Sequence, residues 1–209
     1  VKTKTGEVSV LVATIKLLTK SLRPLPEKWV GIKDPETAFR KRYLDLLMSP
    51  DKKERFMRKA RFWEANRKFM KDHGFIEVET PVLETTVGGA DARPFVTHMN
   101  ALDQDFFLRI STELFEKRLL AAGFEKIYTL GPNFRNEGMD DEHLPEFYQL
   151  EWYWAYADYR DGMKFVKEMY RYIAKEVYGR TKFTSRGMTY DLADEWEEID
   201  YAKVIREKL

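Results

Sequence analysis

Residues 130–159 constrain the fold most, because a polar loop lies there between two segments with the pattern of β-strands. Successive side chains of a strand point to opposite faces of a sheet, so residues 146–153 separate into two sets. One face is purely apolar and aromatic, which predicts a contact with the core. The other face is mixed, which predicts the lining of a pocket. The mixed face carries Phe147, Gln149, Glu151 and Tyr153.

The loop between these segments is suited to closing over a small molecule. Its polar residues are Glu137, Asp140, Asp141, Glu142 and His143. An edge hairpin with one face in water would show the same alternation. The heavy aromatic content of both flanks favours a central hairpin instead.

Composition excludes several classes of function. Charged residues make up 34% of the 209 residues but leave a net charge of only +1, which gives no long-range attraction for nucleic acid. The chain has no cysteine and only three histidines, which lie far apart in sequence, so disulfides are excluded and a structural zinc site is not expected. No apolar run has membrane-spanning length. These features fit a cytoplasmic protein in a reducing compartment.

Periodicity, caps and turn residues predict an α+β fold in which helices pack against an antiparallel sheet. Helices are expected over residues 35–47, 50–73, 113–122 and 159–178, and from about residue 201. Strands are expected over residues 6–18, 75–81, 130–135, 146–153 and 188–192, with a hairpin over residues 95–110. Between residues 20 and 29, Pro24 and Pro26 predict an extended connector.

The helix expected over residues 50–73 has an unusually broad apolar face. It is predicted either to be deeply buried in its own domain or to form a subunit interface. Its core stripe is predicted to be Phe56, Ala60, Trp63 and Met70, widened by Met57, Phe62 and Phe69. The helix over residues 159–178 carries a purely structural stripe: Phe165, Met169, Tyr172, Ile173 and Val177.

Arginines and carboxylates near the predicted sheet are the candidates for chemistry. Arg135 and Arg109 could each hold a carboxylate or a phosphate, because an inward-facing arginine needs an anionic or polar partner. Glu151, among aromatics, needs a cation. The alternative for Arg135 and Glu151 is mutual neutralisation in the core, and for Glu113 it is a favourable place in the first turn of a helix. Neither GxxxxGK[ST] nor GxGxxG occurs, so a nucleotide would be held by arginines and a stacked ring.

Two segments resemble motifs of the class II aminoacyl-tRNA synthetases. The pattern FRNEG…H.PEF..LE.Y over residues 134–153 resembles motif 2, and GFIEVETPVL over residues 74–83 resembles motif 1. KSLRPLPEKW, RYLDL and GGADARPF are most similar to the lysyl-tRNA synthetase family. The resemblance implies three parts: the end of an anticodon-binding OB-fold domain (1–20), a linker with a connecting helix (21–50) and a partial catalytic domain (51–209).

The resemblance also implies an ATP site on motif 2. Arg135 matches the arginine that contacts the α-phosphate of ATP and the carboxylate of the amino acid. Phe147 matches the aromatic residue on which adenine stacks, and Glu137 matches the carboxylate near the adenine amino group. His143 matches a loop residue near the phosphates.

The implied lysine site uses three further positions and a loop. Glu113 matches the carboxylate that holds the α-ammonium group. Glu151 and Tyr153 match the pair that receives the ε-ammonium group, and Gly89 belongs to a loop beside the substrate. A buried carboxylate built for an ammonium group rejects uncharged side chains, because they would leave it unpaired.

The implied reaction is ATP-dependent activation of lysine to lysyl-adenylate, followed by transfer to tRNA(Lys), in a homodimer formed through motif 1. Motif 3 and the carboxylates that hold Mg²⁺ are not expected in this chain, so the chain by itself is expected to be inactive or weakly active, with no metal site. Leu144 and the pair Glu197-Glu198 depart from the usual lysyl pattern.

Three alternatives remain open. A lysyl-synthetase paralogue that modifies a protein lacks the OB-fold domain, so the strand remnant counts against it. The aspartyl or asparaginyl branch of the class is disfavoured by Glu151, which suits a cationic substrate. A non-catalytic, synthetase-like module that binds a partner or dimerises is the third.

Overall fold

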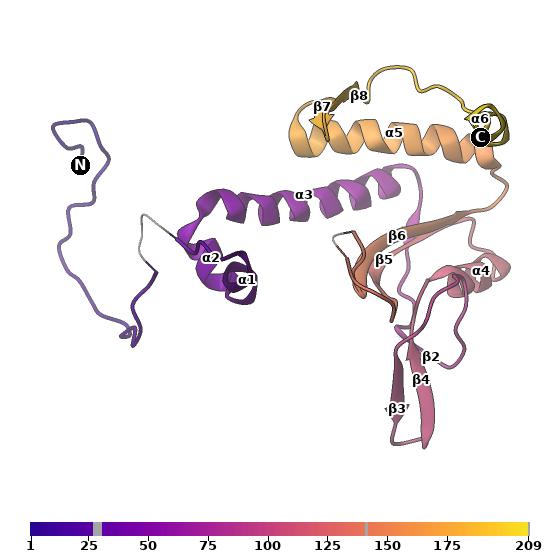
Figure 1. The fold of residues 1–209 in the computed structure, drawn as a ribbon, viewed down its shortest axis with the longest axis horizontal. Helices are drawn as coiled ribbons and strands as arrows, with labels where there is room; N and C mark the ends of the chain where they lie inside the picture. The colour runs from indigo at the N-terminus through magenta and orange to yellow at the C-terminus, as the bar shows by residue number, and fades with distance from the viewer. Residues whose placement is uncertain (27–30, 141, 209) are drawn as a thin grey trace. The chain divides into compact units, whose positions relative to one another are not determined.

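The computed structural model describes residues 1–26, 31–140 and 142–208, and Figure 1 shows its ribbon. The last part of the predicted connector (27–29), Asp141 of the predicted loop and the final residue of the predicted catalytic part lie outside the described residues. The chain divides into two compact units, Val1–Met57 and Arg58–Leu209, and each is described by itself.

The first unit contains two short helices and the start of a long one. α1 (Pro35–Arg40) begins as predicted, because the carboxylate of Asp34 accepts a hydrogen bond of 2.8 Å from the backbone N–H of Thr37. The single helix expected over residues 35–47 was wrong: Lys41, at φ −110° and ψ 47°, separates α1 from α2 (Arg42–Met48). α3 (Pro50–Asp72) continues into the second unit.

The strand expected over residues 6–18 was also wrong. Within the described residues of this segment the structure has only an isolated bridge between Lys2 and Val8, and the valines predicted to face one side are exposed. A strand requires a hydrogen-bonded neighbour, and no described segment forms a β-ladder with residues 10–18. The assignment of residues 1–20 to an OB-fold therefore stays a prediction.

The second unit is built on the central hairpin that the sequence predicted. β5 (Lys126–Phe134) and β6 (Glu146–Trp154) pair antiparallel over their whole length, with Thr129 opposite Glu151. The expectation of a purely antiparallel sheet needs correction, because β1 (Ile76–Glu77) pairs with β5 in parallel. The sheet is mixed because the β3–β4 hairpin and α4 lie between β1 and β5 in the chain. This long connection lets the two strands run in the same direction.

Two smaller sheets and two further helices accompany the hairpin. β2 (Leu83–Glu84), β4 (Gln104–Leu108) and β3 (Val96–Met99) form one sheet, which includes the predicted hairpin. β7 (Lys182–Ser185) and β8 (Met188–Asp191) form the other; only β8 was predicted. α4 (Glu113–Ala121) and α6 (Tyr201–Lys208) lie where helices were expected.

The core of this unit lies between the sheet and two helices, α3 and α5 (Tyr159–Tyr178) (Figure 1). The apolar face of β6 packs there as predicted, through Leu150, Trp152 and Trp154. The predicted stripe of α5 is confirmed, with Phe165 at its centre. No helix in the described part of the chain is both long and apolar enough to cross a membrane.

The predicted core stripe of α3 was only partly right. The buried residues of α3 are Ala65, Asn66, Phe69 and Met70. Phe56 is half exposed and Ala60 is exposed. The reason is that the core of the second unit covers only the C-terminal half of this helix.

Candidate active site

The face of the hairpin opposite the α3–α5 core carries the predicted polar residues. Phe147, Gln149, Glu151 and Tyr153 alternate with the core residues of β6. Across the hairpin, Asn133 lies opposite Phe147, and its side-chain amide donates a hydrogen bond of 2.8 Å to Gln149. The N-terminal end of α4 contributes the remaining groups on this face.

Glu151 is held by the turn that leads into α4. The hydroxyl of Thr112 donates to its Oε2 at 3.0 Å, the backbone N–H of Thr112 donates at 3.4 Å, and the hydroxyl of Ser111 lies 3.2 Å from Oε1. These three donors are neutral, so the carboxylate is oriented while its charge is left without a cationic partner in these contacts.

Arg135 directly follows β5 and packs on the ring of Phe147, with its guanidinium carbon 5.1 Å from the ring centroid. Its Nε is buried and has no hydrogen-bond partner within the described residues. A buried guanidinium N–H without an acceptor favours an anionic ligand at this position.

Arg135 and Glu151 lie apart along the hairpin. The backbone N–H of Arg135 donates to Pro145, six residues before Glu151, which corresponds to about 20 Å of strand. The contacts of each are with other groups, so the mutual ion pair considered from the sequence does not form in the described chain.

One cavity of about 310 Å³ brings together the four residues assigned to ATP. It is lined by Arg135, Glu137, Gly138, Glu142, His143, Leu144 and Phe147. Glu137 accepts a hydrogen bond of 3.1 Å from the backbone N–H of Arg93, which joins the GGADARPF segment to this loop. The imidazole of His143 pairs with Asp140 at 2.8 Å and is largely exposed.

Glu113 is already engaged by a cation of its own helix. The ammonium group of Lys117 lies 2.5 Å from its carboxylate and 6.0 Å from the ring centroid of Tyr153. The hydrogen bond from Lys117 holds the pKa of Glu113 below its usual value. Burial, with the nearby charge of Glu113, raises the pKa of Tyr153. A ligand ammonium group at Glu113 would have to share this carboxylate with Lys117 or displace it.

Gly89 lies against the same end of the site. Its φ of +84° is in the left-handed region that favours glycine. A Cβ atom there would lie 2.8 Å from Cβ of Glu113 and 2.9 Å from Oγ of Ser111. The absence of a side chain at Gly89 therefore lets the loop approach two residues of the site.

We expect Gly89→Ala to destabilise the chain by about 1–3 kcal/mol and to weaken any ligand held at Glu113 or Glu151, because of the positive φ and the displaced Ser111. Urea unfolding and calorimetry would measure both effects. Gly138→Ala is the matched control, since no atom lies within 4 Å of its added Cβ and its φ is not positive. Equal stability of the two variants would contradict this account of Gly89.

Arg109 has a structural role that differs from the anion-binding role considered above. It is 3% exposed, and its guanidinium donates to the backbone oxygens of Pro132 at 2.8 Å and Thr80 at 2.9 Å. Burial lowers its pKa, and the charges of Glu84, Glu116 and Glu151 oppose this. Arg109 thus joins the segment after β1 to β5 and is not available to a ligand.

The sequence analysis did not identify Ser111 and Thr112 as donors to Glu151. Glu116 was missed altogether: it is completely buried, yet in the sequence it looks like an ordinary helical glutamate. No local pattern distinguishes the two situations.

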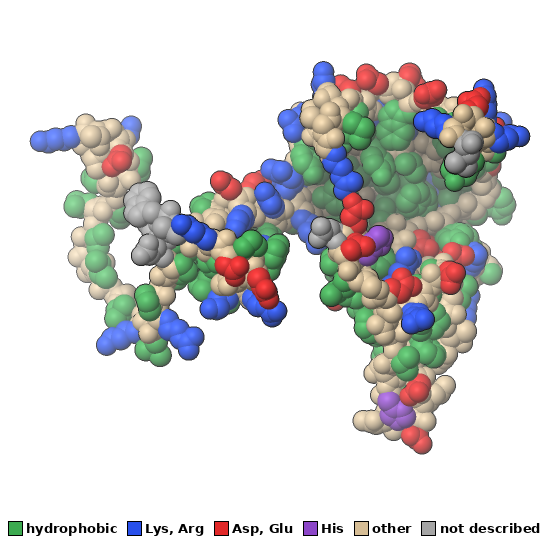
Figure 2. All heavy atoms as spheres, in the orientation of Figure 1, with side chains coloured by type: hydrophobic (Ala, Val, Ile, Leu, Met, Phe, Trp, Pro, Cys, Tyr) green, Lys and Arg blue, Asp and Glu red, His purple; other side chains and the backbone are tan. Residues whose placement is uncertain are grey.

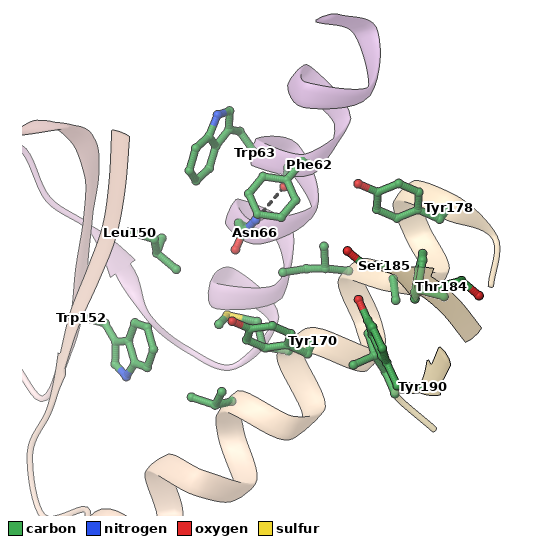
Figure 3. A pocket seen from close by; sticks show the side chains of 16 residues that line it. Phe62, Trp63, Asn66, Leu150, Trp152, Tyr170, Tyr178, Thr184, Ser185 and Tyr190 are labelled. Atoms are coloured by element: carbon green, nitrogen blue, oxygen red, sulfur yellow. Dashed lines mark hydrogen bonds between the residues drawn. The ribbon is translucent and has the colours of Figure 1, made fainter. Parts of the chain in front are cut away.

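A larger cavity than the one beside Arg135 lies on the opposite face of β6. It has a volume of about 730 Å³ and lies between α3, α5, β6 and the β7–β8 hairpin, and Leu150 and Trp152 point toward it (Figure 3). Figure 2 shows hydrophobic side chains gathered in this hollow. Its sixteen lining residues include no charged side chain.

The described residues contain no group of three or more His, Asp or Glu side chains that could hold a metal ion. Within these residues no cluster of protein ligands is assembled for a magnesium ion, and no step of the proposed chemistry is assigned to the metal.

Comparison with known proteins agrees with the geometry. Residues 34–208 match the family model described as tRNA synthetases class II (D, K and N). The chain is 48% identical over 206 residues, 99% of its length, to a lysine–tRNA ligase of Clostridium perfringens (strain 13 / Type A), covering 41% of that protein. It is 48% identical to the lysine–tRNA ligase of Clostridium botulinum (strain Langeland), again covering 99% of this chain and 41% of the relative. For Clostridium novyi (strain NT) the identity is 49%, covering 99% and 40%. The chain spans about two fifths of the length of these curated relatives.

Proposed function

Because this chain belongs to the class II tRNA synthetase family of the D, K and N type, we propose that it is part of a lysine–tRNA ligase. In this proposal it binds ATP and lysine, forms lysyl-adenylate and takes part in transferring the lysyl group to tRNA(Lys) in the cytoplasm. The single observation that supports lysine most directly is the position of Glu151, a carboxylate that three neutral donors orient without neutralising its charge.

Because Arg135 and Glu151 contact other groups and not each other, they suit a ligand that carries an anionic group at one end and a cationic group at the other. One end of the site carries a guanidinium group whose Nε has no acceptor among the described residues. The other end carries a carboxylate, on the same face of the hairpin as the ring of Phe147 that Arg135 contacts. A lysine placed between them would direct its carboxylate toward Arg135 and its ε-ammonium group toward Glu151 and Tyr153. Aspartate has no second cationic group for Glu151, so the same geometry disfavours it.

The proposed reaction is attack of the lysine carboxylate on the α-phosphorus of ATP, with pyrophosphate as the leaving group. Such a step requires alignment and charge neutralisation more than acid or base catalysis. Arg135 is the catalytic residue in this proposal, because it can contact both the carboxylate and the α-phosphate. Phe147, Glu137 and His143 share its cavity, and we assign them to the nucleotide.

Calorimetry of the chain with lysine, aspartate and a lysyl-adenylate analogue tests this function directly. We expect the analogue to bind most tightly, lysine next, and aspartate not measurably. A preference for aspartate would remove the lysyl assignment. If none of the three ligands bound, a non-catalytic module would be favoured. The paralogue that modifies a protein would be supported if lysine were activated but tRNA were not charged by the full-length enzyme.

Phe147→Leu is expected to weaken ATP binding by about twofold to tenfold, because the loss of a stacked ring costs roughly 0.5–1.5 kcal/mol. Lysine binding should remain nearly unchanged, since Phe147 lies at the nucleotide end of the site. Tyr148→Leu is the control, because it removes a ring one position along β6 on the opposite face of the sheet. If both variants bound ATP like the parent chain, adenine would not stack on Phe147.

We also propose a homodimer through α3 and β1, the motif 1 segment. Phe56 and Met57 of α3 are 50% and 52% exposed in the single chain, which favours a further contact. Sedimentation equilibrium should give twice the mass of the chain, and Phe56→Glu should shift it toward the monomer. A monomer at all accessible concentrations would contradict this proposal.

A further inference from the structure

A second carboxylate, Glu116, lies behind Glu151 and has no role in the function proposed above. It belongs to the first turn of α4 and is completely buried. Its Oε1 lies 3.0 Å from the hydroxyl oxygen of Thr112, and its Oε2 has no hydrogen-bond partner among the residues that the structure describes. A buried and ionised carboxylate with one unpaired oxygen is unfavourable.

The hydroxyl of Thr112 links the two carboxylates. Its Oγ1 lies 3.0 Å from Oε1 of Glu116 and also 3.0 Å from Oε2 of Glu151. A hydroxyl has one hydrogen and can donate to only one of them. If both glutamates were ionised, one would face a lone pair of Thr112. A proton on Glu116 resolves the conflict, because Glu116 then donates to Thr112 and Thr112 donates to Glu151.

The charged surroundings favour the same arrangement. Burial raises the pKa of Glu116 to about 7, and the charge of Glu151 contributes to the rise. The polar groups of Thr129 and Thr112 oppose the rise, because they favour the ionised carboxylate. The charged or titratable groups that act on this cluster from other elements are Glu84 on β2, Arg109 after β4 and Glu151 on β6. Arg109 is occupied by backbone carbonyls, and burial also raises the pKa of Glu84.

We propose that Glu116 is a positioning residue that holds a proton behind Glu151 through Thr112 and releases it when an ammonium group binds at Glu151. The O–H bond of Glu116 breaks, and the proton passes to a buffer base in bulk solution. The cause is electrostatic: a cation at Glu151 attracts a second negative charge and removes the repulsion between the two glutamates. The inference rests on the proposed function only in taking lysine as the source of that ammonium group.

The first test needs no ligand. Carbon-13 NMR of glutamate carboxyl groups, with the Glu116 signal assigned by its loss in Glu116→Gln, follows the titration of Glu116 in the 209-residue chain. We expect a titration near neutral pH that moves to lower pH in Glu151→Gln, because the repelling charge is gone. When Thr112→Val is already present, adding Glu151→Gln should change the titration pH of Glu116 by less, because the hydroxyl that links the two glutamates is gone. A titration at the ordinary glutamate value, or one unaffected by Glu151→Gln, would overturn the proposal.

The second test uses lysine. Titration calorimetry at pH 7 in buffers of different ionisation enthalpy should show release of up to about half a proton per lysine bound, the fraction that a group with a pKa near 7 carries there. Lysine should bind about twofold to fivefold more tightly at pH 8 than at pH 6, the change that a coupling of roughly 0.5–1 pKa unit produces over this range. Glu116→Gln should abolish the proton release and flatten the pH dependence. This variant keeps the shape of the side chain, so a merely structural role would not produce that result.

The two tests separate failure of the inference from failure of the proposed function. Lysine binding without proton release, in a chain where Glu116 titrates near pH 7, would overturn the proton-holding role and leave the lysyl assignment intact. Absence of lysine binding at every pH would count against the proposed function. The NMR titration would then decide by itself whether Glu116 and Glu151 are coupled.

Discussion

Glu151→Gln is expected to weaken lysine binding by about 10-fold to 100-fold while changing ATP binding by less than about threefold. A hydrogen bond to a charged group contributes roughly 1.5–3 kcal/mol, and the substitution removes the charge while keeping the shape. Ser111 and Thr112 orient Glu151 through neutral hydrogen bonds, so the glutamine should occupy the same place. Calorimetry with lysine and with ATP, each titrated separately, measures both effects.

Glu146→Gln is the matched control, because it makes the same chemical change on the same strand at an exposed position. It should leave both ligands unaffected. Equal losses of lysine and ATP in Glu151→Gln would indicate a general disturbance of the hairpin and contradict the role assigned to Glu151. Unchanged lysine binding would place the ε-ammonium group elsewhere.

Arg109→Leu is expected to reduce the free energy of unfolding by about 3–5 kcal/mol, the largest effect on stability that we predict. The substitution leaves the carbonyl oxygens of Thr80 and Pro132 without their donor, and it removes the positive charge that faces Glu84 and Glu116. Both buried carboxylates would then lose the charge of Arg109, and of the two only Glu84 is also acted on by Arg118. Urea unfolding monitored by tryptophan fluorescence gives the free energy.

Arg160→Leu is a suitable comparison, because Arg160 is exposed at the start of α5 and exposed side chains usually contribute less than about 0.5 kcal/mol. Loss of Arg109 should be partly compensated at low pH, where Glu84 and Glu116 are protonated. If Arg109→Leu were as stable as Arg160→Leu, its contacts would not join β5 to the segment after β1, and the structural role would be wrong.

Much of the second unit could be predicted locally. The alternation on β6, the capping residues of α5 and the glycines after α3 and α4 are signals within a few residues, and each element begins or ends near the predicted position. The failures have a common cause. Residues 6–18 have the composition of a strand, but a strand forms only with a partner, and α3 has an apolar face along its whole length although the core covers only part of it.

The sequence by itself determined the central hairpin and its two chemically different faces, because strand alternation is a property of neighbouring residues. The residues proposed for ATP and lysine came from the resemblance to a known family. Only the tertiary structure decided how the charged groups are paired. It directed Arg109 to backbone carbonyls, left Arg135 and Glu151 apart on one face, and placed Glu116 behind Thr112. The physical reason is that burial and pairing of a charge depend on which segments meet in space, and the segments that meet here are separated by tens of residues in sequence.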